Sequence, residues 1–192
     1  MGRHRLNPRR ASTQELAKTR AHRYGPLPSL VLLLAVSVLL RLIVAFYLGD
    51  AVPPPYGAPD DTSYSYLAER LADGYGFSFD RPWYPFGKPA GYPTAHWSFL
   101  YTLYLGGIYA LFGPHPLVAR LVGAVLGGIL LPLMSYRLTR RLFPEEERAP
   151  LMAAGCAAFY AFFILFAARL MTETYYIVGA LWAVQRGSAL AE

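Results

Sequence analysis

The chain has 192 residues, of which 55% are hydrophobic and only 16% are charged. This balance is typical of an integral membrane protein and fits a soluble domain less well. The net charge of +6 does not indicate nucleic-acid binding, because the basic residues collect at the ends of apolar segments and form no basic patch interleaved with aromatic residues. The single cysteine, Cys156, lies in an apolar stretch and forms no internal disulfide bond.

The first segment of the chain is basic. Residues 1–26 contain seven Arg or Lys residues and one acidic residue, which is typical of a flexible cytoplasmic tail. Residues 27–48 then form an apolar stretch long enough to cross a bilayer. A cleaved signal peptide is the alternative, but the stretch is long for one and no small-residue cleavage site follows closely. We therefore predict an uncleaved transmembrane helix over 27–48.

Arg41 is an ionisable residue inside this apolar stretch. Such a residue either extends its side chain toward the membrane surface or faces a polar cavity, where it has a functional role. The sequence leaves both alternatives open.

Residues 49–115 are predicted to form an outer loop that carries two short helices. In 62–73, apolar residues recur at helical spacing and Gly74 follows as a stop signal, which predicts an amphipathic helix on the membrane face. Residues 97–112 are apolar and aromatic, but they are few and are interrupted by two glycines. We expect them to form a juxtamembrane helix.

Three more apolar stretches follow this loop. Residues 116–136 and 149–168 are each predicted to cross the membrane, and 171–185 begin a further, partial span. Residues 137–148 separate the first two of these stretches and carry several arginines, so we assign them to a cytoplasmic loop.

The distribution of basic residues decides how many times the chain crosses. The tail and the 137–148 loop both belong on the cytoplasmic side by the positive-inside rule, which requires an even number of crossings between them. Residues 97–112 therefore lie along the outer face, and residues 169–174 return to the same side as Asp60. We predict an all-α, multi-pass protein of the plasma (inner) membrane, a multi-span helical bundle whose N-terminus is cytoplasmic and whose outer loop carries juxtamembrane helices.

Four stretches resemble parts of the polyprenyl-phosphate-sugar-dependent glycosyltransferases of the GT-C fold, in the branch related to protein mannosyltransferases and aminoarabinose transferases. They are an acidic pair followed by a tyrosine and a helix, a proline-rich entry to a juxtamembrane helix, the bounds of the second span, and the outer end of the third span. In sequence they are 60–68, 92–101, Arg120-Leu121 with 140–143, and 169–173. The likeness covers about residues 28–185 and implies the N-terminal part of a longer enzyme.

The resemblance implies that a sugar moves, with inversion, from a polyprenyl-phosphate donor to a hydroxyl of a lipid, glycan or protein acceptor on the outer face. Such a reaction needs a base for the acceptor proton and a positive charge or metal for the departing phosphate. Asp60 is the expected base, because Asp60 and Tyr64 have the four-residue spacing of the family, and Asp61 assists by hydrogen bonding or by contact with a divalent metal. The alternative is that one aspartate merely caps the helix.

Tyr64 is also expected to contact the substrate, and four basic residues are candidates for the phosphate. Lys88 and His96 are preferred because they share a loop with Asp60, and Arg41 and Arg169 follow. Glu173 either binds acceptor or metal or is a solvated residue at a helix start.

Two other functions remain as alternatives. One is a catalytically inactive, truncated relative that acts as a membrane anchor or interaction protein. The other is a transporter, which is disfavoured because the sequence shows neither paired broken helices nor an internal repeat.

Overall fold

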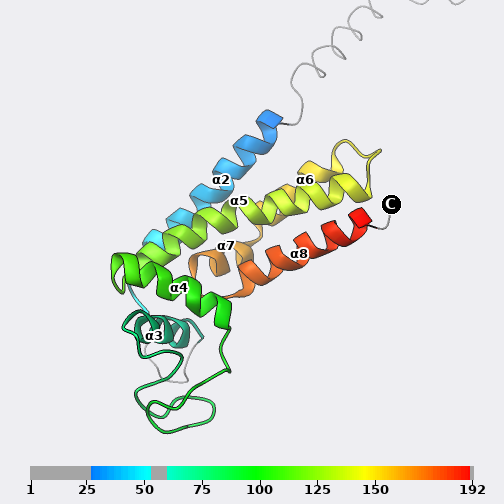
Figure 1. The fold of residues 1–192 in the computed structure, drawn as a ribbon. Helices are drawn as coiled ribbons and strands as arrows, with labels where there is room; N and C mark the ends of the chain where they lie inside the picture. Colours follow the sequence, from blue (N-terminus) through cyan, green and yellow to red (C-terminus); the bar gives the residue numbers. More distant parts are fainter. Residues whose placement is uncertain (1–26, 53–59, 191–192) are drawn as a thin grey trace, which may run out of the picture.

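The computed structural model describes residues 27–52 and 60–190, and within these ranges the regular structure is helical, as expected (Figure 1). Two helices, α2 (Leu27–Leu48) and α5 (Pro116–Leu142), are each long and apolar enough to cross a membrane. A third crossing is available if the bent pair of α6 (Ala149–Phe159) and α7 (Ala161–Ala168) counts as one span. The expected basic tail, 1–26, lies outside the described residues.

Helix α5 is the central helix, because it packs against α2, α4, α6, α7 and α8 (Glu173–Leu190). Small residues on α5 make this possible. A Cβ atom built on Gly128 would lie 2.8 Å from the Cα atom of Val38 on α2, and one built on Gly127 would lie 2.8 Å from the Cβ atom of Ala167 on α7. Small residues at helix interfaces allow this close approach of backbones in membrane proteins.

Helix α5 is longer than the predicted span of 116–136. It continues to Leu142, with Arg140 and Arg141 in its last turn, where basic side chains interact favourably with the negative end of the helix dipole. The apolar stretch ends where the arginines begin, but the helical backbone hydrogen bonding continues through them. The loop expected over 137–148 is therefore reduced to 143–148.

The predicted span of 149–168 is not one straight helix. α6 and α7 meet at Tyr160 with a bend of 55°, and Tyr160 has an extended backbone with ψ of 118°. The break leaves the carbonyl groups of Ala157 and Ala158 free to accept hydrogen bonds from the guanidinium of Arg41, at 3.1 Å each. The same guanidinium also donates to the hydroxyl of Ser37 at 2.6 Å.

These contacts decide where Arg41 lies. Its side chain is fully buried and is occupied by carbonyl and hydroxyl oxygens between α2 and α6. The side chain is therefore enclosed between the helices and directed at neither an open cavity nor the molecular surface.

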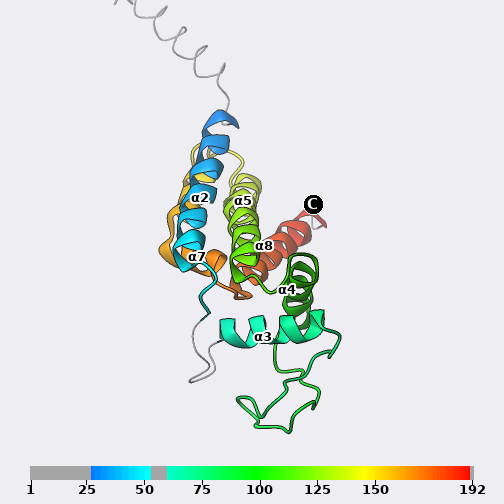
Figure 2. The ribbon, with the colours of Figure 1, turned by 90° about the vertical axis from the view of Figure 1, so that its left-hand side faces the viewer.

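Helices α3 (Asp60–Ala72) and α4 (Phe99–Phe112) pack on each other at one end of the molecule, and the loop between them extends further from α2 and α5 (Figure 2). α3 begins two residues earlier than the predicted 62–73, so both aspartates stand in its first turn, where the helix dipole favours negative charge. α4 begins two residues later than expected, after Ser98. The last helix, α8, covers Glu173–Leu190, whereas the sequence predicts a partial span over 171–185.

Candidate functional site

Asp60 and Asp61 differ sharply in environment although they are neighbours in the first turn of α3. Asp60 is exposed, whereas Asp61 is only 1% exposed. One oxygen of Asp61, Oδ2, accepts hydrogen bonds from Nε of Arg169 at 3.2 Å and from Nη2 at 2.8 Å. The other oxygen accepts the backbone N–H of Thr62 at 3.1 Å. Asp61 is thus a buried, paired carboxylate, and Asp60 is an accessible one.

Arg169 stands in the connection between α7 and α8, and its side chain keeps 31% of its exposure. A guanidinium has five N–H donors in a planar fork. Two of its nitrogens are directed to Asp61, and the partial exposure leaves the group accessible to a second anion. The contact joins two segments that the sequence predicts to lie on the same side of the membrane, the start of α3 and the connection between α7 and α8.

Arg120 is a residue of this cluster that the sequence did not single out as a site residue. It belongs to α5, is 2% exposed, and donates from Nη2 to the carbonyl oxygen of Ala51 at 2.7 Å. It lies close enough to Asp61 and Arg169 to interact electrostatically with both. An arginine inside an apolar stretch needs a polar partner, but the local sequence does not say which residue this partner is.

Tyr64 connects this cluster to the start of α4. Its hydroxyl accepts the backbone N–H of Ser98 at 3.3 Å and is hydrogen-bonded to the side chain of Thr172. Burial raises the pKa of Tyr64, and the carboxylates of Asp60 and Glu173 raise that pKa further. Asp60, Tyr64 and Glu173 are therefore electrostatic neighbours.

Glu173 begins α8 beside the cluster. Within the described part of the chain, its Oε2 atom is buried without a hydrogen-bond partner, and so is Oγ1 of the 2%-exposed Thr174. Buried polar atoms are normally paired, so these two atoms are available to a bound group. Among the described residues, no group of three or more His, Cys, Asp or Glu side chains lies together as a metal site would require.

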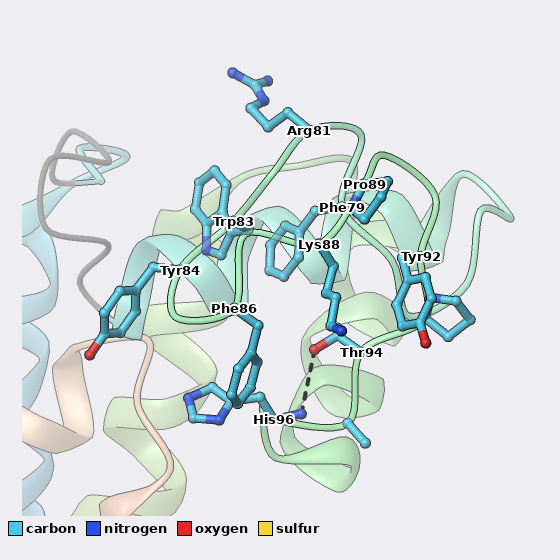
Figure 3. A pocket seen from close by; sticks show the side chains of 12 residues that line it. Phe79, Arg81, Trp83, Tyr84, Phe86, Lys88, Pro89, Tyr92, Thr94 and His96 are labelled. Carbon is cyan, nitrogen blue, oxygen red and sulfur yellow. Dashed lines mark hydrogen bonds between the residues drawn. The ribbon is translucent and has the colours of Figure 1, made fainter.

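The structure brings together five of the eight predicted site residues: Asp60, Asp61, Tyr64, Arg169 and Glu173. Arg41 lies apart from them, in the interior of the bundle. Lys88 and His96 line a separate pocket in the loop between α3 and α4, with a volume of about 340 Å³ (Figure 3). Sharing a loop with Asp60 in sequence therefore did not place them in the carboxylate cluster.

No family model, no curated protein and no solved structure matches this chain. The function is therefore argued from the geometry of the cluster.

Proposed function

We propose that this chain is a membrane glycosyltransferase, or the N-terminal part of one, that moves a sugar from a polyprenyl-phosphate donor to a hydroxyl acceptor with inversion. The observation that supports this function best is the joint presence of the exposed Asp60 carboxylate and the half-buried Arg169 guanidinium at one end of the apolar helices. This end is where the phosphate of a membrane-held lipid and a water-borne acceptor would meet.

The burial of each side chain suggests its role in the transfer. Asp60 is the accessible carboxylate and takes the proton of the acceptor hydroxyl. Arg169 stabilises the negative charge on the departing phosphate. Asp61 is already paired, and it orients Arg169 toward that phosphate. Arg120 adds a second positive charge behind the pair. Glu173, with one unpaired oxygen, binds a hydroxyl of the acceptor.

The proposal includes a position in the membrane. α2, α5 and the α6–α7 pair would cross the plasma (inner) membrane, with the N-terminus in the cytoplasm. α3 and α4 would lie along the outer face as juxtamembrane helices. Several apolar side chains of α4 are exposed, with Leu100 and Leu111 each at 79%, and such a surface suits the boundary of a bilayer or a polyprenyl chain.

The test is the transfer rate of the Asp60→Asn variant. The full chain is purified in detergent and given polyprenyl-phosphate mannose or arabinose together with oligosaccharides, neutral or uronate-bearing, as hydroxyl acceptors, and the polyprenyl phosphate released by the transfer is measured. Loss of the base lowers turnover by about 10²- to 10⁴-fold, while Asp73→Asn, an exposed change at the far end of α3, leaves it unchanged. Equal rates in the two variants would refute the assignment of Asp60.

A non-catalytic membrane protein is the second candidate, and the Asp61–Arg169 contact favours it. An ion pair between α3 and the α7–α8 connection is also what a purely structural tie requires. In that case no donor is consumed by the wild type, and Arg169→Ala affects only the stability of the fold. Donor release that depends on Asp60 excludes this candidate.

A further inference from the structure

The loop between α3 and α4 forms a built pocket rather than a loose connection. It is lined by twelve residues from Phe79 to His96 (Figure 3). Trp83 fixes one wall to α3, because its Nε1 donates to the hydroxyl of Ser63 at 2.9 Å. Backbone hydrogen bonds from Gly91 to the carbonyl of Phe79 at 2.7 Å and from Thr94 to that of Phe77 at 2.8 Å hold the two sides of the loop together.

The lining combines aromatic faces with basic groups. Phe79 and Trp83 stack with ring centroids 4.7 Å apart and planes within 7°. Tyr84, Phe86 and Tyr92 stand at the rim and are 61%, 64% and 53% exposed. The lining contains no Asp or Glu, and its basic residues are Arg81, Lys88 and His96.

Lys88 is the basic group best placed to meet a ligand. Its ammonium lies 5.2 Å from the ring centroid of Tyr92 and points into the pocket beside Thr94 (Figure 3). Arg81 instead points away from the other lining side chains (Figure 3) and is paired with Asp80 at 2.8 Å. Among the described residues, Lys88 has no ion-pair partner, so a ligand would meet its positive charge beside exposed aromatic rings.

This chemistry fits a sugar that carries an acidic group. The C–H faces of a pyranose ring pack on flat aromatic rings, and an ammonium binds a carboxylate or phosphate with a charge-assisted hydrogen bond. A few polar groups in a mainly apolar pocket are the general pattern of a small-ligand site. Exposed aromatic rings also occur where proteins touch the membrane surface, but this loop lies beyond α3, away from α2 and α5 in both views (Figures 1 and 2).

The pocket is connected to the carboxylate cluster through aromatic contacts. The ring of His96 meets that of Trp97 edge to face at 4.9 Å. Trp97 in turn meets Tyr64 at 5.5 Å, and Tyr64 is the electrostatic neighbour of Asp60. The His96 end of the pocket is therefore the end connected, through Trp97, to Tyr64 beside Asp60.

We propose that this pocket binds an acidic saccharide, which serves as the hydroxyl acceptor of the transfer. The identification as acceptor rests on the proposed function, whereas the binding itself does not. Lys88 binds the acidic group, the rim rings hold the sugar faces, and His96 stands at the end nearest Tyr64. Lys88 and His96 thus contact the acceptor and not the donor phosphate.

Lysine protection tests the binding without any donor. The chain has two lysines, Lys18 and Lys88, so acetylation of each amine is read directly by mass spectrometry. The purified full chain is treated with an amine-reactive ester in the presence of uronate-, sialate- or phosphate-bearing oligosaccharides, or of neutral malto-oligosaccharides. We expect at least one acidic saccharide to slow acetylation of Lys88 at least fivefold while Lys18 reacts unchanged.

Pocket variants then identify the site by titration of tryptophan fluorescence. Lys88→Ala and Phe86→Ala are expected to weaken binding of the protecting saccharide at least tenfold. Arg186→Ala and Tyr47→Ala are the controls. They remove a charge and an exposed ring outside the pocket, so the affinity for the saccharide is expected to stay unchanged.

Three outcomes would overturn the proposal: no acidic saccharide protects Lys88, neutral sugars protect it equally, or only phosphatidylglycerol vesicles protect it. The last result assigns the loop to a membrane contact. Binding without any Asp60-dependent transfer refutes the acceptor role alone, and transfer without binding refutes the pocket alone.

Discussion

The Nη2 atom of Arg169 lies 2.8 Å from Oδ2 of Asp61, although 108 residues separate the two in sequence. This contact ties the first turn of α3 to the connection between α7 and α8. The two partners are unequally buried, with side-chain exposures of 31% for Arg169 and 2% for Asp61. Removing one partner therefore has a different consequence from removing the other.

Arg169→Ala should destabilise the fold more than Asp61→Asn does. The first change leaves a buried carboxylate without its charged partner, at a cost of about 2–3 kcal/mol after allowance for the exposure of the arginine. The second leaves a guanidinium that still reaches water, at a cost of about 1 kcal/mol. Thermal unfolding in detergent measures both, and Arg81→Ala, at the exposed pair with Asp80, is the control with no expected change. The reverse order would contradict the burial argument.

Arg41→Leu should destabilise the bundle without changing affinity for a polyprenyl-phosphate donor. The leucine leaves the carbonyls of Ala157 and Ala158 without their donors, and hydrogen bonds to a charged group contribute roughly 1.5–3 kcal/mol. Thermal unfolding and donor binding are measured side by side, with Leu39→Ala, a 56%-exposed position on α2, as the control. Loss of donor affinity in a variant that remains folded would return Arg41 to the phosphate site.

Gly128→Ala and Gly107→Ala form a matched pair for the packing of α5. A methyl group at Gly128 collides with the backbone of Val38, whereas one at Gly107 meets no atom within 4 Å. We expect the first change to cost about 1–3 kcal/mol and the second to be neutral or to stabilise α4 by up to about 1 kcal/mol. Unfolding in detergent gives both values, and equal effects would show that α2 and α5 do not approach closely at Gly128.

The sequence predicts the long apolar helices better than it predicts their irregularities. α2 covers Leu27–Leu48, an apolar stretch that composition and length alone predict to be helical. The break at Tyr160 was not found, because no proline or glycine stands there to signal it. The relevant signal is on another helix: Arg41 needs oxygen acceptors, and an apolar bundle provides them only where backbone carbonyls are released.

Site residues that are close in sequence could be predicted to lie together. Site residues that only the packing of distant helices brings together could not. Asp60 and Tyr64 are about one helical turn apart, so their proximity follows from the spacing. Arg120 joins the cluster only because the folded chain brings the start of α5 close to Asp61 and Arg169, and nothing in the local sequence states this. Lys88 and His96 were assigned to the phosphate because they share a loop with Asp60, but the loop folds on itself into a pocket of its own.

Alkaline pH above about 10 should destabilise the protein through its buried tyrosines. Burial raises the pKa of Tyr109 to about 12 and also raises that of Tyr64, while both titrate near pH 10 in the unfolded chain. The folded state holds these protons more tightly, so their contribution is complete below about pH 10 and is lost as the pH rises toward 12. Unfolding free energies measured from pH 8 to 12 should fall by up to about 2 kcal/mol for Tyr109.

Phenylalanine variants assign this loss to individual residues. Tyr109→Phe removes the phenol that is hydrogen-bonded to Ser65 at 2.9 Å, so the decrease above pH 10 should be smaller in this variant, although its stability at pH 8 is also lower. Tyr84→Phe, at a 61%-exposed position, should leave the pH dependence unchanged. A Tyr109→Phe curve parallel to that of the wild type would show that another group causes the loss.

The loop of α3 and α4 and the loop 143–148 lie at opposite ends of α5 (Figure 1). If α5 crosses the membrane, the two loops face opposite sides, and Arg140, Arg141 and Arg148 predict that the second faces the cytoplasm. In a Cys156→Ala background, Ala90→Cys should react with an impermeant thiol reagent on intact cells and Glu145→Cys only after lysis. If only Glu145→Cys is labelled on intact cells, the topology is the reverse of the predicted one and Asp60 lies in the cytoplasm. A transfer at the outer face would then be impossible.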